Sequence, residues 1–85
     1  MEKKDLTTKQ KDKRIPRLIA EVDSNLESLK AIVVEKQEKL DNMTISEWGN
    51  PEGQKLDGQA NNLVHAEIFL EATLNWLKKA EEFND

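Results

Sequence analysis

The sequence has no cysteine, a single histidine and no long apolar run, and each shortage excludes a class of protein. Without cysteine, neither a disulfide framework nor a thiolate zinc site can form, so the composition fits a reducing, cytoplasmic setting. The longest apolar runs, 31–34 and 68–70, are far shorter than a membrane span or a signal-peptide core. We therefore expect a soluble cytoplasmic protein with no membrane partner.

Side chains for catalysis or for binding a metal or cofactor are also sparse. His65 is expected to face solvent, away from the apolar row of its helix. Glu67 and Glu71 lie one helical turn apart, but the Glu-x-x-His pairs of di-metal helical bundles are absent. The three glycines stand apart and lack the Lys-Ser/Thr of a phosphate-binding loop. The sequence predicts no catalytic, cofactor or metal site, and we expect a protein that is not an enzyme.

Charge is divided unevenly along the chain, whose net charge is −4. Residues 1–17 carry seven basic and three acidic side chains, whereas the remainder carries six basic and fourteen acidic ones. Residues 1–14 also lack apolar periodicity, which predicts a basic, flexible arm. The candidate nucleic-acid contacts are the basic side chains at and just before the start of the first helix: Lys9, Lys11, Lys13, Arg14 and Arg17.

Residues 15–85 are predicted to form a helical hairpin. From Ile15 onward, apolar residues recur at alternating spacings of three and four, which is typical of a helix that packs along one seam. Pro16 suits the first turn of such a helix, because its missing N–H costs no hydrogen bond there. The expected elements are helix 1 at about 16–42, a turn at about 43–51 and helix 2 at about 52–83.

The second helix carries two apolar rows. Leucines recur every seven residues from Leu56 to Leu77, and a second row runs beside them: Ala66, Phe69, Thr73, Trp76, Ala80 and Phe83. One antiparallel partner helix covers only one of these rows, so the other needs a further surface. Self-association of two hairpins into a four-helix bundle is the simplest solution. If the dimer leaves part of the second row uncovered, Phe69, Trp76 and Phe83 are candidate partner-binding residues.

The connection between the helices contains a large aromatic residue, Trp48, among turn-forming residues. Thr44 and Glu47 have the spacing of a capping box, in which each side chain accepts a hydrogen bond from the other residue's backbone N–H. Met43 and Trp48 occupy the two positions of a hydrophobic staple around this box. We therefore expect Trp48 to close the end of the bundle. The alternative is that Trp48 is an exposed partner-binding hot spot.

Two charged residues, Lys36 and Glu67, interrupt the apolar seams. Folding at the turn brings their helices together, so the two are a candidate pair that fixes the register at some loss of stability. The alternative is that both side chains extend to solvent. Most other acidic side chains lie off the seams, where they form either a solvated surface or a docking surface for a basic partner.

Together these features predict an all-α protein, an antiparallel two-helix hairpin that dimerises into a four-helix bundle. The expected function is that of a small, non-enzymatic interaction or regulatory protein of bacterial or phage type. Its expected partners are a second copy of itself and another protein, bound through acidic helix faces or the aromatic row. Two alternatives are a nucleic-acid-binding regulator that uses the basic arm and an acidic inhibitor that imitates nucleic-acid phosphates.

Overall fold

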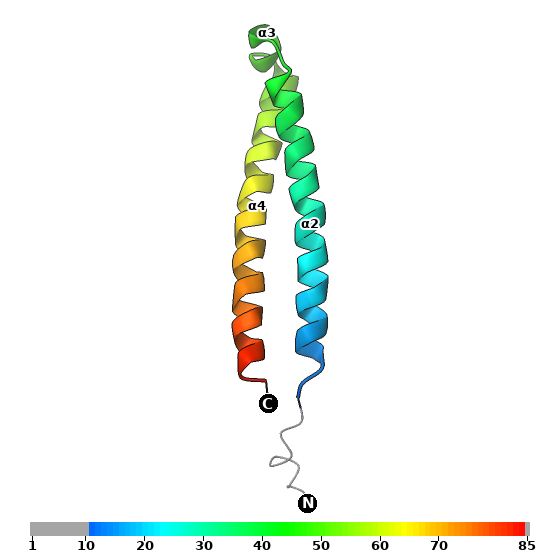
Figure 1. Ribbon diagram of the computed structural model, residues 1–85. Helices are drawn as coiled ribbons and strands as arrows, with labels where there is room; N and C mark the ends of the chain where they lie inside the picture. Colours follow the sequence, from blue (N-terminus) through cyan, green and yellow to red (C-terminus); the bar gives the residue numbers. More distant parts are fainter. Residues whose placement is uncertain (1–10, 85) are drawn as a thin grey trace, which may run out of the picture.

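The computed structural model describes residues 11–84, and all regular structure within them is helical. The predicted all-α class is confirmed. Three helices follow one another: α2 (Arg14–Asp41), α3 (Ile45–Trp48) and α4 (Pro51–Glu82). The long helices α2 and α4 lie side by side and run in opposite directions, with α3 at the end where the chain turns back (Figure 1). The connection expected to be a turn thus contains a one-turn helix, so three helices are described where the sequence predicted two.

Helix α2 begins beside an aspartate that binds its first backbone group. The Arg14 N–H donates to Asp12 Oδ1 at 2.9 Å, and Pro16 lies in the first turn, where no N–H is needed. The helix continues for 28 residues, or roughly 42 Å at about 1.5 Å per residue. At its end, the N–H of Asn42 donates to the carbonyl of Glu38 at 3.1 Å.

Helix α4 begins with a side-chain cap. Asn50 has an extended backbone, and its side-chain oxygen accepts a hydrogen bond from the Gly53 N–H at 3.0 Å. Pro51 follows in the first helical position, where its fixed backbone angle favours the helix. The helix runs for 32 residues, roughly 48 Å at about 1.5 Å per residue, and the Phe83 N–H closes it by bonding the Ala80 carbonyl.

The core is a single seam between α2 and α4. The buried apolar side chains are Leu26, Val33, Leu40, Ala60 and Leu74. Side chains at the intervening seam positions are only half-buried, because each long helix is covered from one side. Such a core is thin for a chain of 85 residues, near the size at which single domains become marginal. Covering a further apolar surface would therefore stabilise the fold appreciably.

The short helix α3 is held by its own cap and by α2. The capping box expected at Thr44 and Glu47 is present, with Thr44 N–H donating to Glu47 Oε1 at 2.8 Å and Glu47 N–H to Thr44 Oγ1 at 3.2 Å. Trp48 reaches back to α2, where its indole N–H donates to the Leu40 carbonyl at 3.1 Å. The same carbonyl, in the last turn of α2, also accepts a hydrogen bond from the Met43 N–H at 3.1 Å, so it has two donors.

Gly53 lets α3 approach the first turn of α4 backbone to backbone. A Cβ atom built on Gly53 would lie 2.1 Å from the carbonyl oxygen of Glu47 and 2.9 Å from the Cα atom of Trp48. Both contacts are with backbone, which cannot rotate away as the end of a side chain can. The position therefore requires glycine, because no other residue lacks a Cβ atom.

Candidate protein-binding face

The sides of the α2–α4 seam can be assigned from the residues next to it. Successive residues of an α-helix are rotated by about 100°, so residues that follow seam residues lie on one side and residues that precede them lie on the other. Lys30 follows Leu29 and Glu71 follows Leu70, and the Lys30 Nζ lies 3.9 Å from Glu71 Oε2 across the seam. This ion pair marks one side, which we call the ion-pair face.

The opposite side is formed by the residues that precede seam residues, and we call it the aromatic face. On α4 its members are Ala66, Phe69, Thr73, Trp76, Ala80 and Phe83, and on α2 they are Leu18, Asn25 and Ile32, with the polar Glu21 and Ser28 between them. The three aromatic residues are widely exposed, with 70% of Phe69, 68% of Trp76 and 85% of Phe83 accessible. On α2, Leu18 and Ile32 are 43% and 41% exposed. The second apolar row of α4 is thus uncovered, and α2 extends it across the seam.

Contacts within α4 orient side chains of the aromatic face but leave them exposed. The Lys79 ammonium lies 4.9 Å from the centroid of the Trp76 ring, a cation–π contact that shields part of one ring face. Thr73 turns its hydroxyl inward to the Phe69 carbonyl at 2.9 Å, so it presents mainly its methyl group to the outside. The α4 part of the face is apolar and suited to packing against another apolar surface, whereas α2 adds the polar Glu21, Asn25 and Ser28 to Leu18 and Ile32.

The ion-pair face carries a smaller apolar group. Val34 and Ile68 are 52% and 56% exposed there, among charged and amide side chains. Isolated exposed aliphatic residues are normal on soluble proteins, whereas a row of three aromatic rings is not. Within the described residues, the aromatic face is therefore the stronger candidate for a binding surface.

Trp48, the fourth candidate partner-binding residue, lies far from this row. It belongs to α3, at the turn end of the molecule, whereas Phe83 follows the C-terminal end of α4 near the opposite end (Figure 1). Its indole N–H bonds Leu40, and 41% of the residue is exposed. Trp48 thus has a structural contact and an open ring surface at once.

Lys36 and Glu67, the candidate register pair, are both half-buried in the seam. Within residues 11–84 no ion pair joins them. The interhelical ion pair lies instead between Lys30 and Glu71, with side chains 40% and 53% exposed. An exposed pair of this kind contributes little to stability. The sequence correctly predicted that Lys36 and Glu67 lie in the seam, but it did not predict that the interhelical ion pair forms between Lys30 and Glu71.

Of the candidate nucleic-acid contacts, Lys9 lies outside the described residues, as does most of the arm predicted at 1–14. Lys11, Lys13, Arg14 and Arg17 are exposed. Arg14 is engaged by Asp12, with Nη2 at 2.6 Å from Oδ2 and Nε at 2.9 Å from Oδ1. These side-chain bonds and the bond from the Arg14 N–H lower the pKa of Asp12 to about 2, and the same pairing raises the pKa of Arg14.

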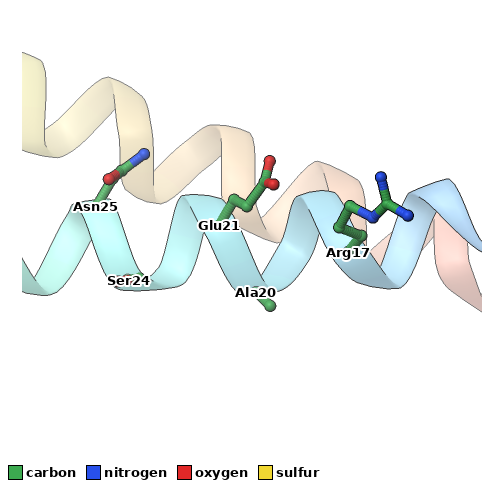
Figure 2. A pocket seen from close by; sticks show the side chains of 5 residues that line it. All are labelled: Arg17, Ala20, Glu21, Ser24 and Asn25. Atoms are coloured by element: carbon green, nitrogen blue, oxygen red, sulfur yellow. The ribbon is translucent and has the colours of Figure 1, made fainter.

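A shallow hollow on α2 is lined by Arg17, Ala20, Glu21, Ser24 and Asn25. Figure 2 shows Arg17, Glu21 and Asn25 projecting to one side of the helix and Ala20 to the other. All five residues belong to one helix, so the hollow is the open surface between neighbouring side chains. His65 is exposed as expected, with Nδ1 2.8 Å from the Asn61 carbonyl of its own helix.

Residues 11–84 contain no group of three or more histidine, aspartate or glutamate side chains placed to hold a metal ion. Over the same part of the chain, no helix combines the length and apolar character needed to cross a bilayer. Compared with protein-family models, curated proteins and solved structures, the chain matches none.

Three features of the structure have no counterpart in the sequence analysis. The contribution of Leu18 and Ile32 to the aromatic face was missed, although both directly precede seam residues, which is a readable signal. The requirement for Gly53 was missed because it depends on where α3 lies. A pair of hydrogen bonds between Asp12 and Asn84 joins the two ends of the described chain, and no local pattern indicates it.

Proposed function

We propose that this protein is a small, non-enzymatic interaction protein that binds a protein partner through the aromatic face. The observation that carries the proposal is the exposure of Phe69, Trp76 and Phe83 in one row on α4. Aromatic residues are enriched among the few residues that supply most of the energy of protein–protein binding. Exposing an apolar surface of this composition to water is unfavourable, and a partner that covers it removes that cost.

We further propose that the protein is an antiparallel two-helix hairpin that assembles into a four-helix bundle. The thin core of five buried side chains supports this, because a second layer on the aromatic face would enclose the half-buried seam residues as well. Helices on both sides of the seam contribute to the face, as a bundle requires.

The basic residues support the nucleic-acid alternative less well. Arg14 is already paired with Asp12, and Arg17 shares its side of α2 with Glu21 (Figure 2). Affinity for a nucleic acid at physiological salt depends on the number of phosphates that basic side chains neutralise, so an arginine held by a carboxylate contributes less to it. A nucleic-acid binder should show a steep salt dependence, whereas binding through the aromatic face should change little with salt.

A matched pair of substitutions tests the proposed function. Trp76→Glu places a carboxylate in the aromatic face, and Ile68→Glu places one at a similarly exposed site on the ion-pair face of the same helix. The immobilised protein is exposed to host extract supplemented with soluble copies of the chain, and retained proteins are quantified by mass spectrometry. We expect Trp76→Glu to abolish specific retention and Ile68→Glu to preserve it. Equal retention by both variants, or loss through Ile68→Glu alone, would contradict the proposal.

A further inference from the structure

We infer that the partner on the aromatic face is a second copy of this chain, with each long helix packed antiparallel to its own counterpart. The two-fold axis passes level with Asn25 on α2 and between Thr73 and Trp76 on α4. This inference rests on the proposed function, that the aromatic face binds protein, and it identifies the partner and the register.

The row on α4 is complementary to itself in the antiparallel direction. Small and large residues alternate strictly along it, in the order Ala66, Phe69, Thr73, Trp76, Ala80 and Phe83. When a second copy is reversed about the point between Thr73 and Trp76, every aromatic ring lies opposite a small side chain. Phe69 then meets Ala80 of the second copy, and Trp76 meets Thr73. Such alternation lets two helix surfaces interdigitate at native density.

A parallel arrangement of the same row packs poorly. Identical residues would then lie opposite each other, so the rings of Phe69 and Trp76 would crowd their own copies. Ala66 and Ala80 would meet only alanines and leave voids. Crowding and voids each cost stability at every such site. The alternation of sizes therefore selects the antiparallel direction.

The aromatic face of α2 has the same kind of symmetry. Leu18, Asn25 and Ile32 are spaced by seven residues, so reversal about Asn25 places Leu18 opposite Ile32 of the second copy. The two Asn25 side chains meet at the axis, where an amide both donates and accepts and can bond its own counterpart. A single buried asparagine of this kind fixes the register of packed helices.

The two symmetry points lie at the same height in the molecule to within about one helical turn, as one two-fold axis requires. Because α2 and α4 are antiparallel, the residue five positions before Lys30 lies level with the residue five positions after its partner Glu71. This places Asn25 level with Trp76. Counting inward from the Asp12–Asn84 contact places Asn25 level with Glu71. The midpoint of the α4 row falls between these two estimates. Two rows with independent sequences thus have centres that agree to within about one helical turn, which nothing in the pairing of α2 with α4 itself demands.

Charge agrees with the same axis. Arg14 and Glu35 both precede seam residues on α2, so they continue the aromatic face at its two ends. Reversal about Asn25 brings Arg14 close to Glu35 of the second copy, and the relation repeats by symmetry. Asp12 accepts from Nε and Nη2 of Arg14, but the side chain is 82% exposed, so its other guanidinium N–H groups can donate to a second carboxylate, with a smaller gain than an unpaired arginine would give.

Single cysteines test the arrangement cleanly, because the chain has none of its own. Asn25→Cys places a thiol at the proposed axis, and Asn75→Cys places one on the ion-pair face at the same height; both asparagines are exposed in the hairpin. Under mild oxidation or with a short thiol crosslinker, we expect Asn25→Cys to form covalent dimers and Asn75→Cys to remain monomeric on denaturing gels. Crosslinking through Asn75→Cys, or none through Asn25→Cys in a protein that sediments as a dimer, would overturn the proposed axis.

A size exchange tests the register on α4. Phe69→Ala leaves a void and Ala80→Phe opposes two rings, so each alone should weaken dimerisation by about tenfold or more. The double variant restores a large residue opposite a small one and should dimerise more tightly than either single variant. Additive losses in the double variant would exclude the antiparallel register. Circular dichroism establishes that each variant keeps its helices, as expected for exposed positions.

Sedimentation equilibrium of the unaltered chain separates this inference from the proposed function. We expect a mass of twice 9.8 kDa at micromolar concentration. A monomer would overturn the inference and the proposed four-helix bundle, whereas Trp76-dependent retention of other proteins in that case would leave the proposed protein-binding role of the aromatic face standing. A dimer that Trp76→Glu does not dissociate would contradict both.

Discussion

Asp12 and Asn84, 72 residues apart, exchange two hydrogen bonds at the open end of the α2–α4 pair. The Asp12 N–H donates to Asn84 Oδ1 at 2.8 Å, and Asn84 Nδ2 donates to the Asp12 carbonyl at 3.0 Å. Asn84 Nδ2 also donates to Glu81 Oε1 at 2.8 Å. The chain entering α2 is thus tied to the chain leaving α4. A truncation that tests the basic arm should end before Asp12, because a longer deletion also removes this contact.

Asn84→Ala is expected to lower the free energy of unfolding by about 1 kcal/mol, since it removes both hydrogen bonds at a partly buried site. Asn75→Ala is the matched control, an exposed asparagine inside α4. Urea denaturation of both variants measures the difference. A loss no larger for Asn84→Ala than for Asn75→Ala would show that the contact is not stabilising in solution.

Lowering the pH should reduce the stability of the start of α2, because Asp12 becomes protonated. The folded state lowers the pKa of Asp12 from 3.8 to about 2, so the folded chain keeps this carboxylate ionised to lower pH than the unfolded chain does. The resulting stabilisation is fully present above pH 3.8 and is lost as the pH falls toward about 2. Because the pair is exposed, the effect should be small and should shrink with added salt.

Asp12→Asn is the control for that prediction. It keeps the backbone N–H and carbonyl that bond Asn84 but removes the ionisable group. Its unfolding midpoint should therefore vary less with pH than that of the unaltered chain in this window. Identical pH profiles for the two proteins would show that Asp12 makes no linked contribution.

Two glycines of α4 should respond to alanine in opposite directions. Gly53→Ala forces a Cβ atom against the backbone of α3 and should destabilise the protein by about 1–3 kcal/mol. Apart from its chain neighbours and the backbone of its own helical turns, a Cβ atom on Gly58 would meet no atom within 4 Å, so Gly58→Ala should stabilise the helix by about 0.5–1 kcal/mol. Thermal melts compare the two variants directly. Stabilisation by both would mean that α3 does not pack against Gly53 in solution.

Trp48 is expected to stabilise the turn end through both its ring and its N–H. Trp48→Phe keeps a ring but removes the bond to the Leu40 carbonyl, at a cost of about 0.5–1.5 kcal/mol. Trp48→Ala should cost more, about 1–3 kcal/mol, less than for a fully buried ring because 41% of Trp48 is exposed. Chemical denaturation gives both values. If Trp48→Ala left stability unchanged but abolished the partner binding seen with the unaltered chain, Trp48 would be a binding hot spot instead.

The sequence by itself determined the helices and their apolar rows, because helical periodicity and caps are local. The alternating spacing that begins at Ile15, the capping box of Thr44 and Glu47, and the second row through Trp76 all depend on residues within a few positions of one another. The geometry of one isolated helix is enough to predict these features from the sequence.

The tertiary structure alone decided which residues meet across the seam. The Lys30–Glu71 pair, the Asp12–Asn84 bonds and the close approach at Gly53 all depend on the heights of α2 and α4 relative to each other, which the path through α3 sets. A shift of one turn along the seam would preserve every local pattern and change every such contact. The similar height of Asn25 and the Thr73–Trp76 midpoint, which agree to within about one helical turn, is a property of that register, and so it became visible only once the chain was folded.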